Sequence, residues 1–281
     1  MATPIGETED LSPRARQILG TVDRVAAEDT RTAARLLREI GVTARALESY
    51  HDHNERKRAP ALVARLLAGE SVALVSEAGT PIVADPGYRL VQAALEADVP
   101  VVVVPGPCAA VAALSGAGLP AQPFLFLGFL PRDPGPRAAL LQARRFEPAT
   151  AVLYEAPHRV LETLGALAEA WGDRPAALVR NLTKPHEAWL RGTVGSVRAA
   201  LAAEEEVRGE ITLVVAGYDG PPSAAADAQV DALIDQLVDA GVSVQVVRDV
   251  VGSVYARSRR DVYQRALKRR AARDDEDEDE P

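Results

Sequence analysis

The sequence contains a single cysteine, Cys108, in 281 residues. One thiol excludes an internal disulfide framework, and it excludes zinc sites and iron–sulfur clusters built from several cysteines. No apolar run approaches the roughly 18 to 20 residues of a membrane-spanning helix, and no basic and apolar leader precedes a small-residue cleavage site. With 47% hydrophobic and 26% charged residues, the composition predicts a globular, cytoplasmic protein with well-packed cores.

Lysine is also scarce, at three residues, and the net charge of −8 is concentrated in one place. Residues 274–280 read DDEDEDE, so the rest of the chain is close to neutral. Directly before this run, residues 248–273 hold nine basic side chains against two acidic ones. Such a segment is able to bind phosphates, although a chain rich in arginine throughout would place arginines there by composition alone.

Over the first 120 residues, helical patterns alternate with short apolar strands. Residues 11–22 predict a helix with Ser12 as N-cap and Pro13 in its first turn. Further helices are expected at 32–41 and 59–69, and strands at 25–30, 46–53, 71–81 and 99–107. The last two strands are continuous apolar runs, which is typical of strands with both faces covered. The fold class is therefore α/β, with an open, mostly parallel sheet between helices.

Five domains and segments are expected along the chain. Residues 1–120 form an N-terminal α/β domain, and residues 121–218 form a second, smaller α/β domain with a more irregular order of strands. Residues 219–229 are a linker by their glycine, proline, serine and alanine content. Residues 230–271 form a small basic helical appendage, and residues 272–281 form a disordered acidic tail.

Three turns rich in glycine and proline follow predicted strands. They are TPIG (3–6), SEAGTPIVADPG (76–87) and PGPCAA (105–110). Each alone reads as an ordinary turn, but ligands of open α/β sheets bind beyond the carboxyl ends of the strands, so three together favour a binding site. None is a GxGxxG or GxxxxGKS loop, which disfavours a pyrophosphate ligand.

These turns belong to a longer series of blocks with a family resemblance. The blocks include ATPIGETEDLSPRAR, AAEDTRTAARLL, SYHDHNE, SVALVSEAGTPIVADPGYRLV, VPGPCAAVAALSGAGLP, LYEAPHR and NLTKPHE. In order and spacing, over roughly residues 2–268, they closely resemble the ribosomal RNA small-subunit (cytidine-2'-O)-methyltransferases of the tetrapyrrole-methylase superfamily. The blocks SYHDHNE, YEAPHR and TKPHE point to this RNA branch rather than to the cobalamin and sirohaem methylases.

The resemblance implies a function. The methyl donor would be S-adenosyl-L-methionine, bound in a cleft between two α/β domains. The acceptor would be the ribose 2'-hydroxyl of a decoding-region cytidine in 16S ribosomal RNA, as RNA or in the small ribosomal subunit, and the enzyme would be a homodimer. Two alternatives stay open: a tetrapyrrole (precorrin or uroporphyrinogen) C-methyltransferase, and a non-catalytic RNA-binding or ribosome-assembly protein.

The resemblance and the turns together select the residues expected at the donor. They are Pro4, Gly6, Ser76, Glu77, Ala78, Gly79, Thr80, Pro81, Pro105, Gly106, Pro107 and Ala109. Three positions depart from the family pattern: Glu77 replaces its usual Asp, Glu7 its Asn, and Asn181 its Glu.

The catalytic residues are expected in two blocks at strand ends. Glu155 or His158 would accept the ribose proton, Lys184 and Arg159 would hold a phosphate or stabilise the alkoxide, and Glu187 would orient one of them. The alternative is that Glu155 and Arg159 form a structural ion pair at a helix start. Asp85 and His53 are the next candidates for the base.

RNA contacts are expected from cations and histidines along the chain. They are Arg31, His51, His53, Arg159, Arg257, Arg259 and Arg260. His51 and His53 share one strand face, as two metal ligands would, but a third ligand is not evident and methyl transfer needs no metal, so we expect no metal site. Relatives of this kind carry a short apolar strand before ATPIG, so either the reading frame begins upstream of Met1 or the first strand is truncated.

Overall fold

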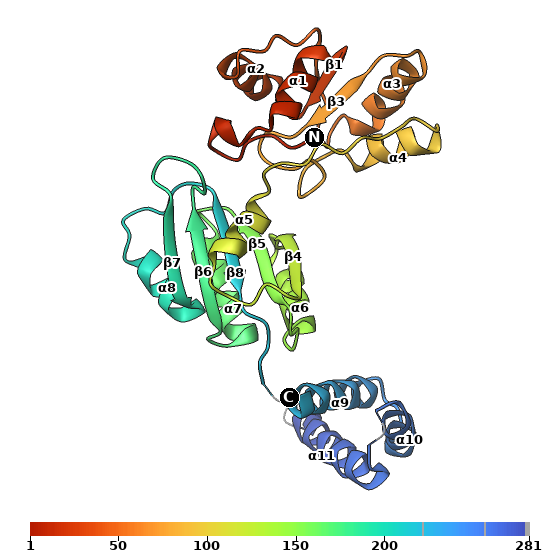
Figure 1. The fold of residues 1–281 in the computed structure, drawn as a ribbon. Helices are drawn as coiled ribbons and strands as arrows, with labels where there is room; N and C mark the ends of the chain where they lie inside the picture. Colours follow the sequence, from red (N-terminus) through yellow and green to blue (C-terminus); the bar gives the residue numbers. More distant parts are fainter. Residues whose placement is uncertain (221, 256, 279–281) are drawn as a thin grey trace. The chain divides into compact units, whose positions relative to one another are not determined.

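The computed structural model describes residues 1–220, 222–255 and 257–278 of the chain. The chain forms two compact units, which we call unit 1 (Met1–Tyr218) and unit 2 (from Asp219 onward). Unit 1 holds two β-sheets with their helices, whereas the described part of unit 2 is helical (Figure 1). None of the described helices has the length and hydropathy needed to cross a bilayer.

The first sheet of unit 1 is parallel, with strand order β2-β1-β3. Its elements are η1 (Thr8–Asp10), α1 (Pro13–Thr21), β1 (Arg24–Ala27), α2 (Thr30–Glu39), β2 (Leu47–Ser49), α3 (Glu55–Leu67), β3 (Val72–Val75) and α4 (Tyr88–Glu96). Side chains alternate along β1: Val25 and Ala27 pack with α1 and α2, whereas Ala26 packs with α3 and α4. Helices thus cover both faces of this sheet, as the continuous apolar runs predicted (Figure 1).

Capping residues fix where the first two helices begin. The Ser12 hydroxyl accepts a hydrogen bond from the Ala15 N–H at 3.1 Å, with Pro13 in the first turn, so the predicted start of α1 is confirmed. Asp29 caps α2 by accepting from the Arg31 N–H at 2.7 Å. Because α2 starts directly after Asp29, Glu28 is held in the short turn between β1 and α2.

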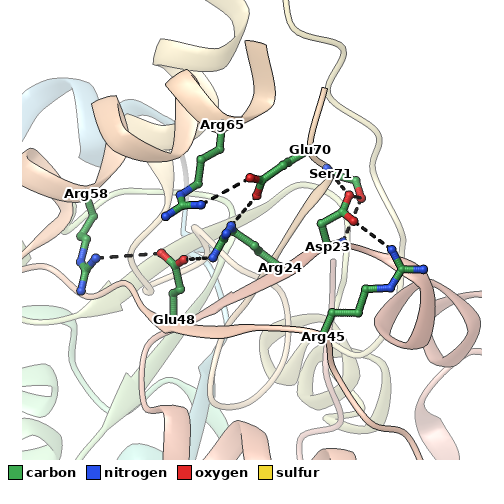
Figure 2. A network of polar contacts seen from close by, with 8 residues as sticks. All are labelled: Asp23, Arg24, Arg45, Glu48, Arg58, Arg65, Glu70 and Ser71. Atoms are coloured by element: carbon green, nitrogen blue, oxygen red, sulfur yellow. Dashed lines mark hydrogen bonds and ion pairs between the residues drawn. The ribbon is translucent and has the colours of Figure 1, made fainter. Parts of the chain in front are cut away.

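An ion-pair network ties the three parallel strands together at their amino ends. Arg24, at the start of β1, pairs with Glu48 of β2 on one side and with Glu70, before β3, on the other, where Nε and Oε2 are 2.5 Å apart (Figure 2). Beside it, Asp23 accepts from the backbone and hydroxyl of Ser71 at 2.9 and 2.7 Å. The central arginine therefore bridges both neighbours of its strand.

The expected strand at 99–107 is wrong, because no strand forms in this segment of the structure. A strand needs a neighbour to pair with, and this segment meets one only at Val104, whose carbonyl accepts from the Ala2 N–H at 3.2 Å. On the other side of the same N-terminal residues, the Met1 ammonium donates to the Leu74 carbonyl of β3 at 2.8 Å. Val102 and Val103 are left 73% and 76% exposed.

The second sheet of unit 1 is mixed, with strand order β4-β5-β8-β6-β7. Its elements are α5 (Ala109–Gly116), β4 (Phe124–Phe129), α6 (Pro134–Ala143), β5 (Thr150–Glu155), α7 (Val160–Trp171), β6 (Pro175–Arg180), β7 (Ala188–Thr193), α8 (Val194–Ala202) and β8 (Ile211–Val215). Among the described pairs of neighbouring strands, only β4 and β5 are parallel. The strand β8 is antiparallel to both β5 and β6, and β7 is antiparallel to β6. The more irregular order of strands expected after residue 120 is thus present in this sheet.

The two faces of this sheet are covered by different helices (Figure 1). Leu153 and Leu213 face α6, α7 and α8, whereas Val152 and Val214 face α5. The helix α5 lies before residue 121, yet its buried residue Ala113 packs on this second sheet. The boundary expected at 120/121 therefore does not match the packing, which moves α5 to the second half of unit 1.

Unit 2 contains α9 (Pro222–Asp239), α10 (Val244–Val254) and α11 (Arg259–Glu278) around a valine-rich core. Two boundaries expected from the sequence are wrong: most of the expected linker 219–229 belongs to α9, and α11 continues past residue 272 into the acidic run. An alanine-rich stretch precedes the packed residue Val230 in α9, whereas the part of α11 that follows the packed residue Ala266 is mostly charged. Residues 279–281 of the expected tail lie outside the described part of the chain.

Aspartates of α9 pair with arginines of the basic segment. Asp227 contacts Arg257 at 2.9 Å, and Asp235 contacts Arg269 at 2.8 Å. Arg265 contacts three aspartates, of which Asp231 is 3.1 Å away. Part of the positive charge that the sequence displays is thus used inside the unit.

Candidate functional site

The three turns expected to form a site meet at one end of the parallel sheet. Thr3 and Gly79 exchange backbone hydrogen bonds of 2.9 and 3.1 Å, and the Thr3 hydroxyl donates to the Ser76 carbonyl at 3.2 Å. The Thr80 hydroxyl donates to the Pro107 carbonyl at 2.9 Å. These bonds join residues far apart in the sequence, so the prediction that the turns lie together is confirmed.

Beside these turns, unit 1 contains a cavity of about 510 Å³, within the size range of small-molecule sites. One wall comes from the carboxyl end of the parallel sheet and the start of α5, and the other from the second sheet. The lining residues are Ile5, Glu28, Glu77, Ala78, Gly79, Thr80, Val83, Ala84, Asp85, Cys108, Ala109, Phe129, Tyr154, Glu155, Ala156, Pro157, Gly209, Glu210, Ile211 and Thr212.

The charges on this lining all have one sign. Glu28, Glu77, Asp85, Glu155 and Glu210 line the cavity, and none of its lining residues is lysine, arginine or histidine. A cavity with this lining attracts a cation and repels a phosphate. It therefore suits a positively charged ligand better than a nucleic-acid backbone.

Two of these carboxyl groups have perturbed pKa values. Burial, followed by the negative charges of Asp85 and Glu77, raises the pKa of Glu28 to about 7. Burial and the charges of Glu77 and Asp52 raise the pKa of Asp85 to about 6, against a hydrogen bond with Ser76 that acts in the opposite direction. Carboxyl groups that exchange protons near neutral pH are common in active sites.

The loop after β3 is held in an unusual backbone conformation. Gly79 has φ of 83°, and the non-glycine residues Ile82 and Ala84 have φ of 75° and 67°. A β-branched residue such as Ile82 rarely adopts positive φ, so the surrounding contacts must impose it. Strain of this kind is concentrated at functional sites.

The expected donor residues divide between the cavity wall and its support. Glu77, Ala78, Gly79, Thr80 and Ala109 line the cavity. The others do not line it and are Pro4, Gly6, Ser76, Pro81, Pro105, Gly106 and Pro107. Gly6 and Gly106 have packing roles: a Cβ on Gly6 would be 2.5 Å from Lys184 Cγ, and one on Gly106 would be 2.9 Å from Ala2 Cβ.

Of the expected catalytic residues, Glu155 is the one that lines the cavity. Its carboxylate is almost fully buried and already has three partners: the Ala156 N–H at 2.8 Å, the Thr163 hydroxyl at 2.5 Å, and Arg159 at 3.6 Å. Arg159 in turn donates to the Leu130 and Pro131 carbonyls. These contacts correspond to the structural ion pair that the sequence left open.

The remaining expected catalytic residues do not line the cavity. His158 is exposed, and Lys184 pairs with Glu210 of the cavity wall. Glu187 accepts from the Thr183 N–H and the Trp189 indole, both at 2.8 Å, and so shapes its own loop.

The expected RNA contacts of unit 1 lie around the site rather than in it. Arg31 is 90% exposed and pairs with Asp29 at 2.6 Å, and His53 is exposed beside the His51 ring. No cluster of three or more His, Cys, Asp or Glu able to hold a metal exists among the residues that the structure describes.

Comparison with known proteins identifies the family to which the chain belongs. The model of the tetrapyrrole (corrin/porphyrin) methylases matches residues 2–198. The ribosomal RNA small subunit methyltransferase I of Micromonospora olivasterospora is 49% identical over 265 residues, which are 93% of this chain and 83% of that protein. The chain belongs to the tetrapyrrole methylase family. It is accordingly a methyltransferase with S-adenosyl-L-methionine as its methyl donor.

Solved structures agree with this family fold. A uroporphyrin-III C-methyltransferase from Thermus thermophilus is 26% identical with a TM-score of 0.53, covering 76% of this chain and 91% of that one. The same enzyme complexed with S-adenyl homocysteine aligns with 21% identity and a TM-score of 0.52, covering 75% and 94%, and supports the fold alone. Both alignments leave about a quarter of this chain uncovered.

One acidic residue of the cavity lining, Glu28, was not selected from the sequence. Glu28 follows the apolar strand β1 as Glu77 follows β3, so the rule that selected the turn after β3 would also have selected it. The second-sheet residues Phe129, Tyr154 and Thr212 were missed as well, because nothing in the sequence shows which face of that sheet meets the cavity.

Proposed function

We propose that this tetrapyrrole methylase family member transfers a methyl group to the ribose 2'-hydroxyl of a decoding-region cytidine in 16S ribosomal RNA. The observation that carries the proposal is the 49% identity, over 93% of the chain, to a protein named ribosomal RNA small subunit methyltransferase I. The proposed enzyme acts in the cytoplasm as a homodimer, as the sequence blocks imply.

The cavity of unit 1 is the proposed donor site, and its properties fit the donor. Its acidic lining suits the sulfonium cation, and its volume suits a nucleoside-sized ligand. The main chain at Gly79 and Thr80 and the first turn of α5 at Ala109 would hold the donor, with Glu77 and Asp85 close to its positive charge. The donor supplies an electrophilic methyl group with a good leaving group, and this chain has to align the ribose oxygen with it.

The phosphates of ribosomal RNA would lie outside the cavity, since its acidic lining repels them. In unit 1, the exposed Arg31 and His53 are the proposed contacts. In unit 2, Arg260 and the largely exposed Arg259 stay in the proposal, although Arg259 is 3.8 Å from Asp249, whereas Arg257 pairs with Asp227 at 2.9 Å. Lys268 and Arg270 join them, because among the described side chains neither has an ion-pair partner.

The test is to incubate the protein with labelled S-adenosyl-L-methionine and small ribosomal subunits that lack ribose methylation. Digestion of the RNA to nucleosides and mass spectrometry should find 2'-O-methylcytidine. Label in added uroporphyrinogen instead would identify a tetrapyrrole C-methyltransferase. RNA binding without any transfer would identify a ribosome-assembly protein.

A further inference from the structure

Glu28 is an acidic side chain of the cavity lining that has no partner in the described part of the chain. Among the described residues it makes no side-chain hydrogen bond or ion pair, although it lines the cavity at the carboxyl end of β1. The Glu155 carboxylate is enclosed by three partners, and Glu210 pairs with Lys184. Glu77 is exposed. Glu28 is therefore a half-buried carboxylate whose lone pairs stay available to a ligand.

The charges that raise the pKa of Glu28 are all carboxylates. The nearest charges are those of Asp29, Asp52, Glu77 and Asp85, and the other titratable groups of the cavity are Cys108, Tyr154, Glu155 and Glu210. The cation nearest in sequence, Arg31, forms its ion pair with Asp29 rather than with Glu28. Burial and these negative charges give Glu28 its pKa of about 7, so it exchanges protons near neutral pH.

We propose that Glu28 is the general base of the methyl transfer, accepting the proton of the attacking ribose hydroxyl in the cavity. The inference rests on the function proposed above. The ribose oxygen forms its bond to the methyl carbon as the carbon–sulfur bond breaks, and the electron pair of that bond stays on sulfur. The O–H proton passes to the Glu28 carboxylate and leaves to water after the product departs.

Glu28 meets the two requirements of a base better than Glu155 and His158, the first candidates selected from the sequence. A base needs an accessible lone pair within reach of the substrate, and the Glu155 carboxylate is enclosed while His158 does not line the cavity. It also needs to be deprotonated at working pH while remaining basic enough to accept a proton, which the pKa of Glu28 allows.

The experiment measures the single-turnover rate of ribose methylation across pH 5.5 to 9, with small ribosomal subunits as the acceptor and donor binding followed separately by calorimetry. The parent rate should fall about tenfold per pH unit at pH values below the pKa of the base in the complex. Glu28→Gln should lower the rate at least about 100-fold at every pH while donor affinity stays within a few-fold.

A second variant separates a base from a structural residue. Asp85→Asn removes a negative charge that raises the pKa of Glu28, so the acidic limb of the rate profile should move to lower pH. The matched control is Glu96→Gln, an acid of α4 outside the cavity, which should leave the profile unchanged.

The experiment distinguishes a wrong proposed function from a wrong assignment of the base. If the parent does not methylate ribose at all, the proposed function is wrong. If the parent methylates ribose but Glu28→Gln retains its rate within a few-fold, or if the limb does not move in Asp85→Asn, Glu28 is not the base.

Discussion

At the residue scale, Ala109 gives the most direct access to the proposed donor site. It is the first residue of α5 and lines the cavity, so Ala109→Leu should fill part of the donor volume. We expect donor affinity to fall at least about 100-fold, since an overfilled pocket must either exclude the ligand or distort. Calorimetric titration with S-adenosyl-L-methionine measures the change.

The control for this variant lies on the same helix. Val111 is 54% exposed and does not line the cavity, so Val111→Leu should bind the donor as the parent does. Equal affinity in both variants would remove the cavity from the donor site. Gly106→Val is a poorer probe, because its side chain would meet Ala2 before it met a ligand.

Ionisation of Glu28 should lower the stability of unit 1 at high pH. Its pKa is raised from 4.5 to about 7 on folding, so the folded state resists ionisation and loses relative stability as the pH rises through this interval. Glu28→Gln removes that cost, and we expect unit 1 to gain about 1 kcal/mol at pH 8, after discounting for solvent screening, and clearly less at pH 5. Thermal unfolding at both pH values measures the difference.

A loss of stability in Glu28→Gln at pH 8 would mean that a favourable contact holds the carboxylate. The expected gain, combined with lost activity, is the usual signature of a group kept ionisable for function at the expense of stability.

The sequence predicted which turns line the site but not the roles of the individual side chains. The pattern placed Gly79 and Thr80 at the site because glycine and proline mark where strands end. It could not distinguish Glu155 from Glu28, because availability depends on partners such as Thr163 and Arg159, which tertiary packing supplies.

At the element scale, the network around Arg24 tests how the parallel strands are held (Figure 2). Arg24→Met would leave Glu48 and Glu70 facing each other without the cation between them. We expect a lower unfolding midpoint at pH 7 and a smaller deficit in high salt, which screens the repulsion.

The pH dependence of this deficit follows from Glu70. Its hydrogen bond to Arg24 lowers its pKa, so the stabilisation is present above the ordinary carboxyl value and is lost as the pH falls through the lowered one. The deficit should therefore shrink in acid. Arg45→Met is the matched control, because Arg45 is 64% exposed and Asp23 is its one ion-pair partner among the described side chains, so it should change the midpoint little. Equal midpoints for both variants would contradict the bridging role.

Helices and strands were predicted correctly where the residues that determine them lie within one segment of the chain. The start of α1 was predictable because Ser12 and Pro13 act locally. The strand at 99–107 was not, because a strand depends on a neighbour, and the hydrogen bonds of Ala2 and Met1 show that only Val104 meets one. Periodicity measures a segment's preference and carries no information on its partner.

At the scale of the whole molecule, the sequence indicated a basic appendage but not how its charge is used. The arginines of residues 248–273 looked equivalent, yet Arg257 and Arg269 pair with aspartates of α9. The acids of α9 recur at helical spacing, but the ion pairs could have been predicted from them only if the packing of α9 against α11 had been known. Cations without partners are therefore the better candidates for RNA.

This distinction predicts which unit 2 variants weaken RNA binding. Among the described side chains, Arg260, Lys268 and Arg270 have no ion-pair partner. Replacing all three with Ala should weaken binding of small-subunit RNA and reduce the slope of log affinity against log salt by up to about 2, because each phosphate contact contributes about 0.7. Donor affinity should not change.

The matched control is Arg257→Ala, whose cation is already neutralised by Asp227 and whose loss should leave the salt slope within error. An unchanged slope in the triple variant would assign unit 2 to another task, such as contacts between subunits of the proposed dimer.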